Sequence, residues 1–514
     1  MMLLMLNAAG LAGLAALVTV LSLYLILAPV FTSPLRRVPT AHWSCSVSSI
    51  WILWTRYRRR ELAVVEAKHR QLGPIVRLGP ADLSLGCYDN GIRAVYNGGF
   101  EKASYYDFFS YYGQKNAFCS LSRQEHGLCR RRITAAYTKT ALFASQSLAA
   151  LTQEILCRRL LPLIQHHAQR NQPTDILSLS HGLSLDLLTA FQFGLCSASN
   201  FVQSPAALHV WNKHYEQRYC KEAFWIQELP RLTRWLKRLG IHLLPRSQAE
   251  STRYLEDWLM ALCDRAERVC SMEREAVAKA DLPVVYELMK KAVQADMAND
   301  DADVKRRVIA SELFDQMSGG REVLGLVLAY TIFYISQNPD AQTKLRAQLA
   351  TLQPSMHRSP NDQALPSPRS LDTLPYLSAV LKESYRMRPT STPLPRITPR
   401  DRPVCLAGIP DIPPGTRVNA FQWLIHRNPD NYRHVDHWDP ERWLEETKDG
   451  RPLLLWAFGG GSRMCVGVSL THYLMRYIIA ILYSNFTSRV VSKRTGHFEP
   501  GSTEDEIIVQ FEPL

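Results

Sequence analysis

The chain has 514 residues, of which 46% are apolar and 21% are charged, and its formal net charge is +13. The apolar fraction excludes an intrinsically disordered chain. The length allows one large catalytic domain or two to three ordinary ones. The positive charge indicates an anionic partner, either an acidic lipid surface or an acidic protein. The sequence contains no nucleic-acid-binding motif, so we expect no nucleic-acid partner.

The eleven cysteines form no C-x-x-C pair and no Cys/His group at zinc spacing. An odd number of cysteines in a chain of this length disfavours a disulfide scaffold. We therefore expect reduced thiols that face the cytosol.

The N-terminal 31 residues are nearly all apolar, and residues 8 to 31 are long enough to cross a bilayer as a helix. A cleaved signal peptide is the alternative, but the run is longer than usual and no basic segment precedes it. Basic residues follow it instead, at Arg36, Arg37 and the run Arg56 to Arg60, which places the body on the cytoplasmic side beside an anionic leaflet. We predict a membrane anchor over residues 1–32, with its span at about 8–31, and a Pro/Arg-rich hinge over residues 33–60.

The remainder, residues 61–514, is predicted to be one mainly helical domain with a minor β portion. Short apolar runs between Gly-Pro turns over residues 73–86 predict a hairpin. Helical periodicity dominates the next three hundred residues. One long helix is expected from about Asp303 to Gln337, ending at Asn338-Pro339 and interrupted by Gly319-Gly320.

The segment FGGGSRMCVG, residues 458–467, surrounds one cysteine with glycines and precedes an apolar run that starts at Val466. Such a loop lets a flat, bulky ligand approach the backbone closely. A helix beginning at Val466 would place Cys465 at its N-terminus, where the dipole and unpaired N–H groups stabilise a thiolate. A thiolate is an effective iron ligand, and thiolate ligation of haem favours O–O bond cleavage. Arg463 is close enough to bind an acidic group of the same ligand.

This segment resembles the F-x-x-G-x-R-x-C-x-G haem loop of the cytochrome P-450 superfamily at Phe458, Gly461, Arg463, Cys465 and Gly467. The resemblance covers roughly Pro34 to the C-terminus and is strongest to microsomal enzymes of filamentous-fungal specialised metabolism. It implies the cytochrome P-450 fold, with Cys465 as the axial ligand of a haem b iron.

The resemblance assigns roles to six further residues. Glu383, Arg386 and Arg442 match a buried Glu–Arg–Arg triad that braces the haem side of the core. His126 and Arg130, one helical turn apart, match a helix whose two residues bind a haem propionate. A basic surface helix is the alternative there, because Arg131 and Arg132 compete for the role. Arg396 matches a third propionate-binding residue.

The central helix departs from the family pattern [A/G]-G-x-[D/E]-T-[T/S], whose acid and hydroxyl deliver protons at the oxygen site. Here Glu322 takes the position of the acid, while Val323 replaces the threonine. We expect Glu322 to relay protons with the help of water or a substrate hydroxyl. The alternative is that Glu322 only pairs with a neighbouring basic side chain and stabilises the helix.

The substrate pocket is expected to be aromatic and apolar, because the Tyr- and Phe-rich residues 100–121 match the family's substrate-contacting loop. About half of these aromatic residues are expected to pack the core instead. Ser318, Thr392 and Leu394 are further positions expected to face the ligand.

Together these features predict a membrane-anchored haem-thiolate monooxygenase that oxidises a lipophilic small molecule, a terpenoid or polyketide intermediate. It would use O₂ and electrons from an NADPH-dependent reductase, and it would face the cytosol from the endoplasmic reticulum. One alternative keeps the fold but catalyses desaturation, rearrangement or further oxidation of an oxygenated substrate. The other is a non-catalytic, membrane-tethered haem protein.

Overall fold

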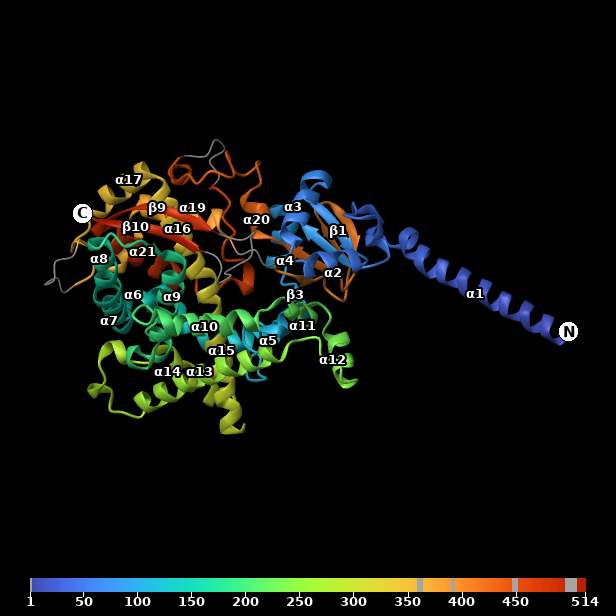
Figure 1. Cartoon of the computed structure of the whole chain (residues 1–514), viewed down its shortest axis with the longest axis horizontal. Helices are drawn as coiled ribbons and strands as arrows, with labels where there is room; N and C mark the ends of the chain where they lie inside the picture. Colours follow the sequence, from blue (N-terminus) through green and yellow to red (C-terminus); the bar gives the residue numbers. More distant parts are fainter. Residues whose placement is uncertain (1, 358–363, 390–392, 446–451, 495–505) are drawn as a thin grey trace. The chain divides into compact units, whose positions relative to one another are not determined.

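The computed structural model describes residues 2–357, 364–389, 393–445, 452–494 and 506–514, and within the first helix it leaves out the side chains of residues 2–9, 11 and 25–29. The described backbone is mainly helical with three small sheets (Figure 1). It divides into two compact units. Unit 1 comprises Met1–Ala103 and Thr392–Ile425, and unit 2 comprises Ser104–Ser391 and His426–Leu514.

Unit 1 is built on a five-stranded sheet of order β1-β2-β8-β5-β3. Strands β1 and β2 pair antiparallel with Ile75 opposite Leu85, which confirms the hairpin predicted over residues 73–86. Strand β8 lies parallel to β2 and antiparallel to β5, which in turn pairs with β3. The strands are β1 (Ile75–Gly79), β2 (Asp82–Leu85), β3 (Glu101–Lys102), β5 (Arg396–Ile397) and β8 (Arg417–Ala420). A second hairpin pairs β6 (Val404–Leu406) with β7 (Ile409–Ile412).

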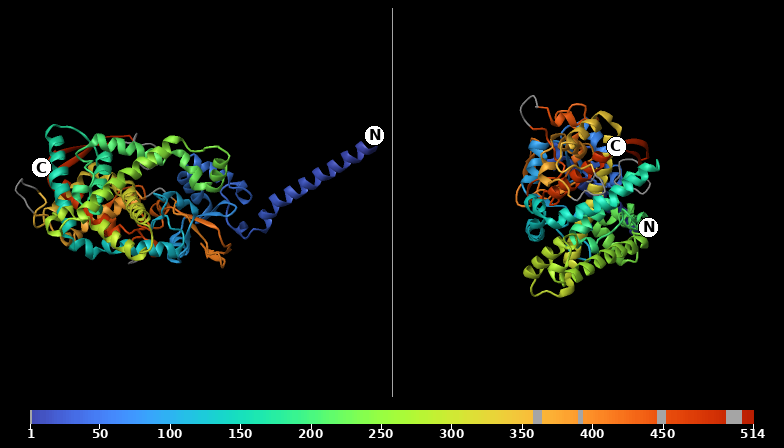
Figure 2. Two further views of the ribbon diagram at one scale, coloured as in Figure 1. Left: turned by 90° about the horizontal axis from the view of Figure 1, so that it is seen from below. Right: turned by 90° about the vertical axis from the view of Figure 1, so that its left-hand side faces the viewer.

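The N-terminal helix α1 (Met2–Thr32) projects from the rest of unit 1 in Figure 1 and in the left view of Figure 2. Large apolar side chains are exposed along it, among them Leu14, Leu17 and Val20. Among the residues whose side chains are described, no helix is long and apolar enough to cross a membrane. The transmembrane helix predicted over about 8–31 is therefore unsupported, and the side chains of residues 8, 9, 11 and 25–29 of it lie outside the described ones.

Three short helices complete unit 1, namely α2 (Ile50–Tyr57), α3 (Glu61–Leu72) and α4 (Arg93–Asn97). Helix α2 buries Ile52 in a small core with Val65 and Val76. Its Arg56 is also buried, because the guanidinium pairs with Glu61 and Asp82 at 2.9 Å each. The structure thus buries the first arginine of the juxtamembrane run predicted over Arg56 to Arg60, whereas Arg58, Arg59 and Arg60 are exposed.

Unit 2 holds most of the helices and the large hydrophobic core. Almost every residue of α9 (Ile176–Phe193) is buried, and this helix lies against α16 (Leu326–Gln337). A sheet of order β4-β10-β9 packs beside them, formed by β4 (Thr174–Asp175), β9 (Phe486–Arg494) and β10 (Glu506–Pro513). The other described helices before α15 are α5 (Arg123–Tyr137), α6 (Lys139–Ala144), α7 (Gln146–Gln153), α8 (Leu161–Gln169), α10 (Pro205–Arg218), α11 (Phe224–Glu228), α12 (Pro230–Arg238), α13 (Arg246–Cys270) and α14 (Val284–Asp296). Those after α16 are α17 (Pro339–Leu349), α18 (Pro368–Asp372), α19 (Pro375–Met387) and α21 (Val468–Asn485). The short helix α20 (Gln422–His426) crosses the boundary in sequence, with its residues up to Ile425 in unit 1 and His426 in unit 2.

The long central helix has the predicted interruption. Helix α15 (Ala302–Gly319) passes into a π-helical turn over Gly320–Gly325 and continues as α16, which ends at Gln337 before Pro339. A Cβ atom on Gly320 would lie 1.9 Å from Leu188 Cδ1 of α9. The glycine thus permits the close approach of α9 at the point where the helical register changes.

Candidate active site

The loop Phe458–Gly467 folds back on itself before α21. Gly459 and Gly461 have φ angles of 74° and 65°, a region that side chains rarely adopt. The N–H of Cys465 donates to the carbonyl of Phe458 at 2.9 Å, which closes the loop. Helix α21 begins at Val468 with Gly467 as its N-cap, two residues later than predicted. Cys465 therefore precedes the helix by three residues and does not occupy its first turn.

Cys465 is reached by solvent, although protein atoms surround its thiol on several sides. Burial raises the pKa of this thiol above its ordinary value. The backbone N–H groups of Gly467 and Val468 and the charge of Arg130 act in the opposite direction, as the prediction of a stabilised thiolate requires, but burial outweighs them.

Two arginines tie the loop to the segment that leads into α5. The guanidinium of Arg463 donates to the carbonyls of Ser120 and Leu121, at 2.7 Å each. Arg130, on α5, donates to the carbonyl of Met464 at 2.8 Å. Burial lowers the pKa of Arg130, and the neighbouring Cys465 acts against that shift. His126, one turn before Arg130, is buried at 6% exposure.

The third predicted anion-binding residue, Arg396, lies on β5, which belongs to unit 1. It is buried, and its guanidinium lies 4.6 Å from the centre of the Tyr96 ring and donates to the carbonyl of Pro395 at 3.1 Å. The hydroxyl of Tyr96 donates in turn to the carbonyl of Leu394. Thr392 lies outside the described residues.

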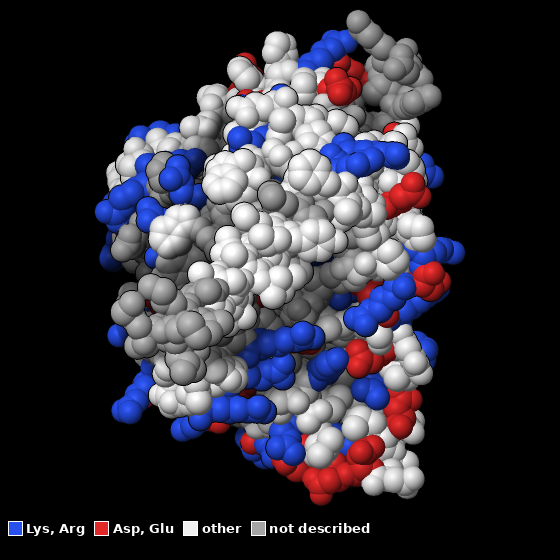
Figure 3. Space-filling model, turned by 90° about the vertical axis from the view of Figure 1, so that its right-hand side faces the viewer, with Lys and Arg blue, Asp and Glu red and all other residues white. Residues whose placement is uncertain are grey.

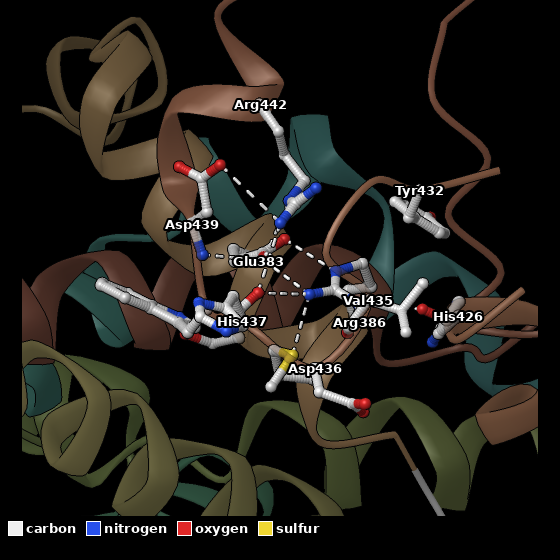
Figure 4. Close-up of polar contacts among 12 residues, drawn as sticks. Glu383, Arg386, His426, Tyr432, Val435, Asp436, His437, Asp439 and Arg442 are labelled. Atoms are coloured by element: carbon white, nitrogen blue, oxygen red, sulfur yellow. Dashed lines mark hydrogen bonds and ion pairs between the residues drawn. The ribbon is translucent and has the colours of Figure 1, made fainter. Parts of the chain in front are cut away.

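Glu383, Arg386 and Arg442 meet in the interior of unit 2 (Figure 4). Arg386 binds Glu383 through two hydrogen bonds of 2.7 and 2.9 Å, and Arg442 binds the same carboxylate at 3.1 Å. Both oxygens of Glu383 receive further donors, the N–H of Asp439 and the indole N–H of Trp443. The carboxylate is thus fully engaged, which offsets the cost of burying it.

Arg386 extends this cluster to a histidine that sequence reasoning missed. Its guanidinium donates to the carbonyl of His426 at 2.9 Å, and Nε2 of His426 accepts the N–H of Trp456 at 3.0 Å. Trp456 precedes Phe458 by two residues, so the cluster positions the start of the cysteine loop. Burial, followed by the charge of Arg386, lowers the pKa of His426 to about 3. No motif or spacing in the sequence singles out this histidine.

Glu322 lies on the π-helical turn and pairs with its neighbour in sequence. Nη1 of Arg321 contacts Oε1 of Glu322 at 2.7 Å. Arg321 is itself buried, stacked over the ring of Tyr215 at 4.6 Å and hydrogen-bonded to Oδ1 of Asn212 at 3.0 Å. The alternative interpretation of Glu322, as a carboxylate that only pairs with a neighbouring basic side chain, predicts this contact.

Val323, at the position where the family pattern has threonine, is exposed, in contrast to buried Arg321. Val323 is 42% exposed, and a Cβ atom on Gly319, one turn before it, would meet no other atom within 4 Å. These two positions mark an open face of the central helix. Ser318, in contrast, is buried between α15 and α10, where its hydroxyl lies 2.7 Å from that of Tyr215 and 3.2 Å from that of Tyr219.

The aromatic segment before α5 divides as expected between core and accessible surface. Tyr106 and Tyr111 are buried at 1% exposure, and Tyr111 packs on Phe314 of the central helix. Phe118 is 36% exposed and contacts Phe109 edge to face.

The arrangement fits an iron held by a porphyrin. Across the described residues, no group of three or more His, Cys, Asp and Glu side chains is placed to hold a bare metal ion. Cys465 instead offers one accessible sulfur beside glycines at which a bulky ligand can approach, since Gly459 also has no atom near its Cβ position. Arg130 and Arg463 bring two cations to the same loop, which suits a ligand with acidic groups.

Comparison with known proteins decides the family. The family model for cytochrome P450 matches residues 52–509. The chain belongs to the cytochrome P450 family. Its membership makes it a monooxygenase with a haem-thiolate iron cofactor, a small-molecule substrate and O₂ as co-substrate.

The similar proteins are fungal cytochrome P450 enzymes whose sequence identity to this chain is low. The chain is 26% identical to cytochrome P450 monooxygenase macH of Penicillium terrestre, covering 94% of this chain and 92% of that protein. It is 23% identical to cytochrome P450 monooxygenase FGM1 of Gibberella zeae, covering 90% and 87%. It is 25% identical to the fusicoccadiene C-8 hydroxylase of Alternaria brassicicola, covering 83% and 79%.

Proposed function

We propose that this cytochrome P450 oxidises a lipophilic terpenoid or polyketide intermediate of fungal secondary metabolism, with electrons from an NADPH-dependent reductase. The observation that carries the site assignment is the cysteine loop of unit 2, which Arg130 ties to α5 and Arg463 ties to the segment just before α5. The fusicoccadiene hydroxylase among the similar proteins acts, by its name, on a terpenoid hydrocarbon. This likeness supports the terpenoid class.

In this proposal Cys465 is the axial ligand, and binding of iron offsets the burial that otherwise raises the pKa of the thiol. The haem, when bound, supplies the chemistry that reduces and cleaves O₂. Phe458, Gly461 and Gly467 shape the loop around it. Cationic and polar side chains bind its propionates, namely His126, Arg130, Arg396 and Arg463.

The buried cluster of Glu383, Arg386 and Arg442 has a structural role. It fixes the segment before the cysteine loop through His426 and Trp456. The loop can then be open and rich in glycine, because its ends are held by neighbouring elements.

Proton delivery is assigned to Glu322. Arg321 engages its Oε1, which leaves Oε2 as the atom that can pass a proton through water toward the open face at Gly319 and Val323. Val323 offers no hydroxyl, so water or a polar group of the substrate must complete the path. Arg321 is a positioning residue for this carboxylate.

The same region favours a second candidate reaction. Without a hydroxyl at position 323 and with Glu322 paired, proton delivery is weaker than in the usual family pattern. This supports desaturation, rearrangement or further oxidation of an oxygenated substrate. Oxygen incorporated into the product, measured with labelled O₂, separates hydroxylation from desaturation and rearrangement.

We further propose that residues 1–32 anchor the enzyme in the endoplasmic reticulum as a single pass, followed by a hinge over 33–60 and the catalytic domain over 61–514. Three facts support the anchor: no residue of α1 is charged, its described apolar side chains are exposed, and Arg36 and Arg37 follow it. The net charge of +13 favours docking of an acidic reductase face.

The experiment that tests the assignment is the Cys465→Ala variant. It should abolish the red-shifted absorption band of the carbon monoxide complex, which reports thiolate ligation. Cys129→Ala is the matched control, because Cys129 sits on α5 next to Arg130 and is only partly buried. A Cys465→Ala protein that keeps the band would refute the ligand assignment.

A further inference from the structure

Arg218, on α10, is a buried cation that forms no ion pair with any carboxylate of the described residues. It is 4% exposed, whereas many Lys and Arg side chains lie at the surface, as Figure 3 shows for one face. Three other buried arginines of unit 2, Arg321, Arg386 and Arg442, each pair with a glutamate. A buried charge without a counterion is costly. The position of Arg218 therefore points to an anion that the protein itself does not supply.

One edge of the Arg218 guanidinium lacks a strong acceptor. Nη1 donates to Oγ1 of Thr252 on α13 at 2.9 Å. Nη2 makes two contacts to backbone carbonyls of the segment before α5, both long at 3.4 Å. Nε is buried and has no hydrogen-bond partner among the described residues. In the buried triad, Nε and Nη2 of Arg386 bind the two oxygens of Glu383. The same edge of Arg218 is thus the one suited to a carboxylate.

The groups around this guanidinium do not provide the negative charge. It lies 4.6 Å from the centre of the Tyr111 ring and 5.8 Å from that of Tyr219. Burial raises the pKa of Tyr111 well above its ordinary value, so its phenol is neutral at pH 7. Glu256 acts on Arg218 only from beyond ion-pair distance, and its Oε1 accepts the N–H of Tyr112 at 2.7 Å.

A chain of hydroxyls connects the surroundings of Arg218 with the central helix, all within unit 2. The hydroxyls of Tyr111 and Tyr219 lie 2.8 Å apart, and the hydroxyl of Tyr219 lies 3.2 Å from that of Ser318. Ser318 directly precedes Gly319, which marks the open face of this helix. Tyr219 is half-buried. A ligand that lies along the open face can therefore place a polar end beside Tyr219 and Arg218.

These donors suit a flat anion with two oxygens. A carboxylate takes two parallel N–H groups from one edge of a guanidinium, and hydroxyls can donate to its remaining lone pairs. We infer that Arg218, Tyr111 and Tyr219 bind a carboxylate of the substrate, so that the enzyme oxidises a lipophilic acid. This inference rests on the proposed function, because it names a class of substrate within it. Arg218 is then a specificity-determining residue.

The test compares ligands that differ in charge but not in their hydrocarbon part. Dodecanoic acid and farnesoic acid are titrated, beside their methyl esters, into the full-length haem-loaded protein in detergent. Binding is followed by the shift of the haem absorption band. Wild-type protein should bind the acids about tenfold or more tightly than the esters, because the acids add hydrogen bonds to a charged group. Arg218→Gln should remove this preference and leave ester binding unchanged.

Two further variants keep the test decisive if Arg218→Gln is unstable. Arg218→Lys keeps the charge but not the paired donors, so it should lose most of the preference for acids. Tyr219→Phe keeps the ring but not the hydroxyl, and it should weaken acid binding severalfold. Arg265→Gln is the matched control, because Arg265 is a partly buried arginine of α13 that donates to the carbonyl of Ser197 at 2.9 and 3.1 Å. It should keep the full preference.

The outcomes separate this inference from the proposed function. Wild-type protein that binds the acids no more tightly than the esters, or that binds neither, would overturn the inference even with an intact carbon monoxide band. A variant Arg218→Gln that melts at lower temperature and binds acids and esters equally weakly would also overturn it, since Arg218 would then only brace α10 against α13. A preference for acids that depends on Arg218, in a protein that oxidises no terpenoid or polyketide, would support the anion site and contradict the proposed function alone.

Discussion

At the scale of single residues, the π-helical turn of the central helix carries one charged pair, Arg321 and Glu322. Arg321 is a buried cation whose described polar partners are Glu322 and Asn212. Removing the carboxylate would leave that cation without its anionic partner, which is costly in a protein interior. The pair therefore serves stability whatever Glu322 does in catalysis.

Two effects of Glu322→Gln can accordingly be separated. If Glu322 relays protons, product formation should fall about a hundredfold, with substrate binding little changed and more peroxide released. If the pair is only structural, the variant should lose thermal stability while the ratio of product to NADPH consumed stays constant. Product, peroxide and melting temperature measured on one sample decide between them.

The double variant Arg321→Met, Glu322→Gln provides the control. It removes both charges, so it should recover the stability lost by Glu322→Gln. It should not recover coupling if Glu322 is the relay. Val323→Thr should improve coupling only when Glu322 carries the relay. Coupling restored by the double variant would exclude Glu322 as a proton donor.

At the scale of elements, the packing of the central helix against α9 depends on which positions hold glycine. Gly320 faces Leu188 of α9, whereas Gly319 faces open space. Both have helical dihedral angles, so alanine is compatible with the backbone at either position. The two neighbouring glycines thus separate packing from helix propensity.

Gly320→Ala should destabilise the protein by about 1–3 kcal/mol, because its methyl group must displace Leu188. Gly319→Ala should instead stabilise it by about 0.5–1 kcal/mol, since alanine restricts the unfolded chain. Urea unfolding of the two variants beside the wild type measures both. Equal effects at the two positions would contradict the close approach of α9.

A second element, α20, makes stability depend on pH through His426. Its pKa is about 3 in the folded protein and about 6.5 when unfolded. Because folding lowers the pKa of His426, its neutral imidazole adds to the free energy of unfolding. This contribution is complete above pH 6.5 and is lost as the pH falls toward 3. Between pH 7 and pH 5 the free energy of unfolding should therefore drop by about 2 kcal/mol from this group.

The variant His426→Gln should remove this part of the slope of unfolding free energy against pH, because glutamine can accept the N–H of Trp456 but does not titrate. Urea unfolding at pH 7 and pH 5 measures the difference. His472, whose pKa burial lowers to about 4, adds a similar slope of its own and should be unaffected by the substitution. His434→Gln, at an exposed imidazole, is the neutral control. An unchanged slope in His426→Gln would show that folding does not lower the pKa of His426.

At the scale of the whole molecule, the sequence predicts local elements better than the partners of charged side chains. The hairpin and the interrupted central helix follow from glycine, proline and apolar periodicity, which act over a few residues. The partners of Arg56 lie up to 26 positions away at Asp82, and only the fold brings them together. For the same reason the sequence places Arg56 in the basic run, although the fold buries it. The contacts of His426 depend on Arg386 and Trp456, which no local pattern connects.

The start of α21 shows a second limit. Apolar residues from Val466 onward predict a helix there, but Val466 and Gly467 are still part of the loop that Cys465 closes on Phe458. A loop set by hydrogen bonds across seven residues overrides the propensity of the next two. Loop geometry around a ligand site is thus the part of the site that periodicity describes least well.

The clearest test at this scale is removal of residues 1–32. All described residues of the cysteine loop, α5 and the buried triad lie downstream, so the shortened protein should still bind haem and give the red-shifted carbon monoxide band. It should lose stable insertion, because the long apolar segment is gone. Residual membrane binding through Arg36, Arg37 and the exposed Arg58 to Arg60 should remain and should weaken as salt screens these charges. Sedimentation with vesicles across a salt series measures it, and full-length protein is compared in parallel. Full-length protein that appears in the soluble fraction after gentle lysis would contradict the anchor. A shortened protein whose membrane binding resists salt would show that these arginines do not carry the residual affinity.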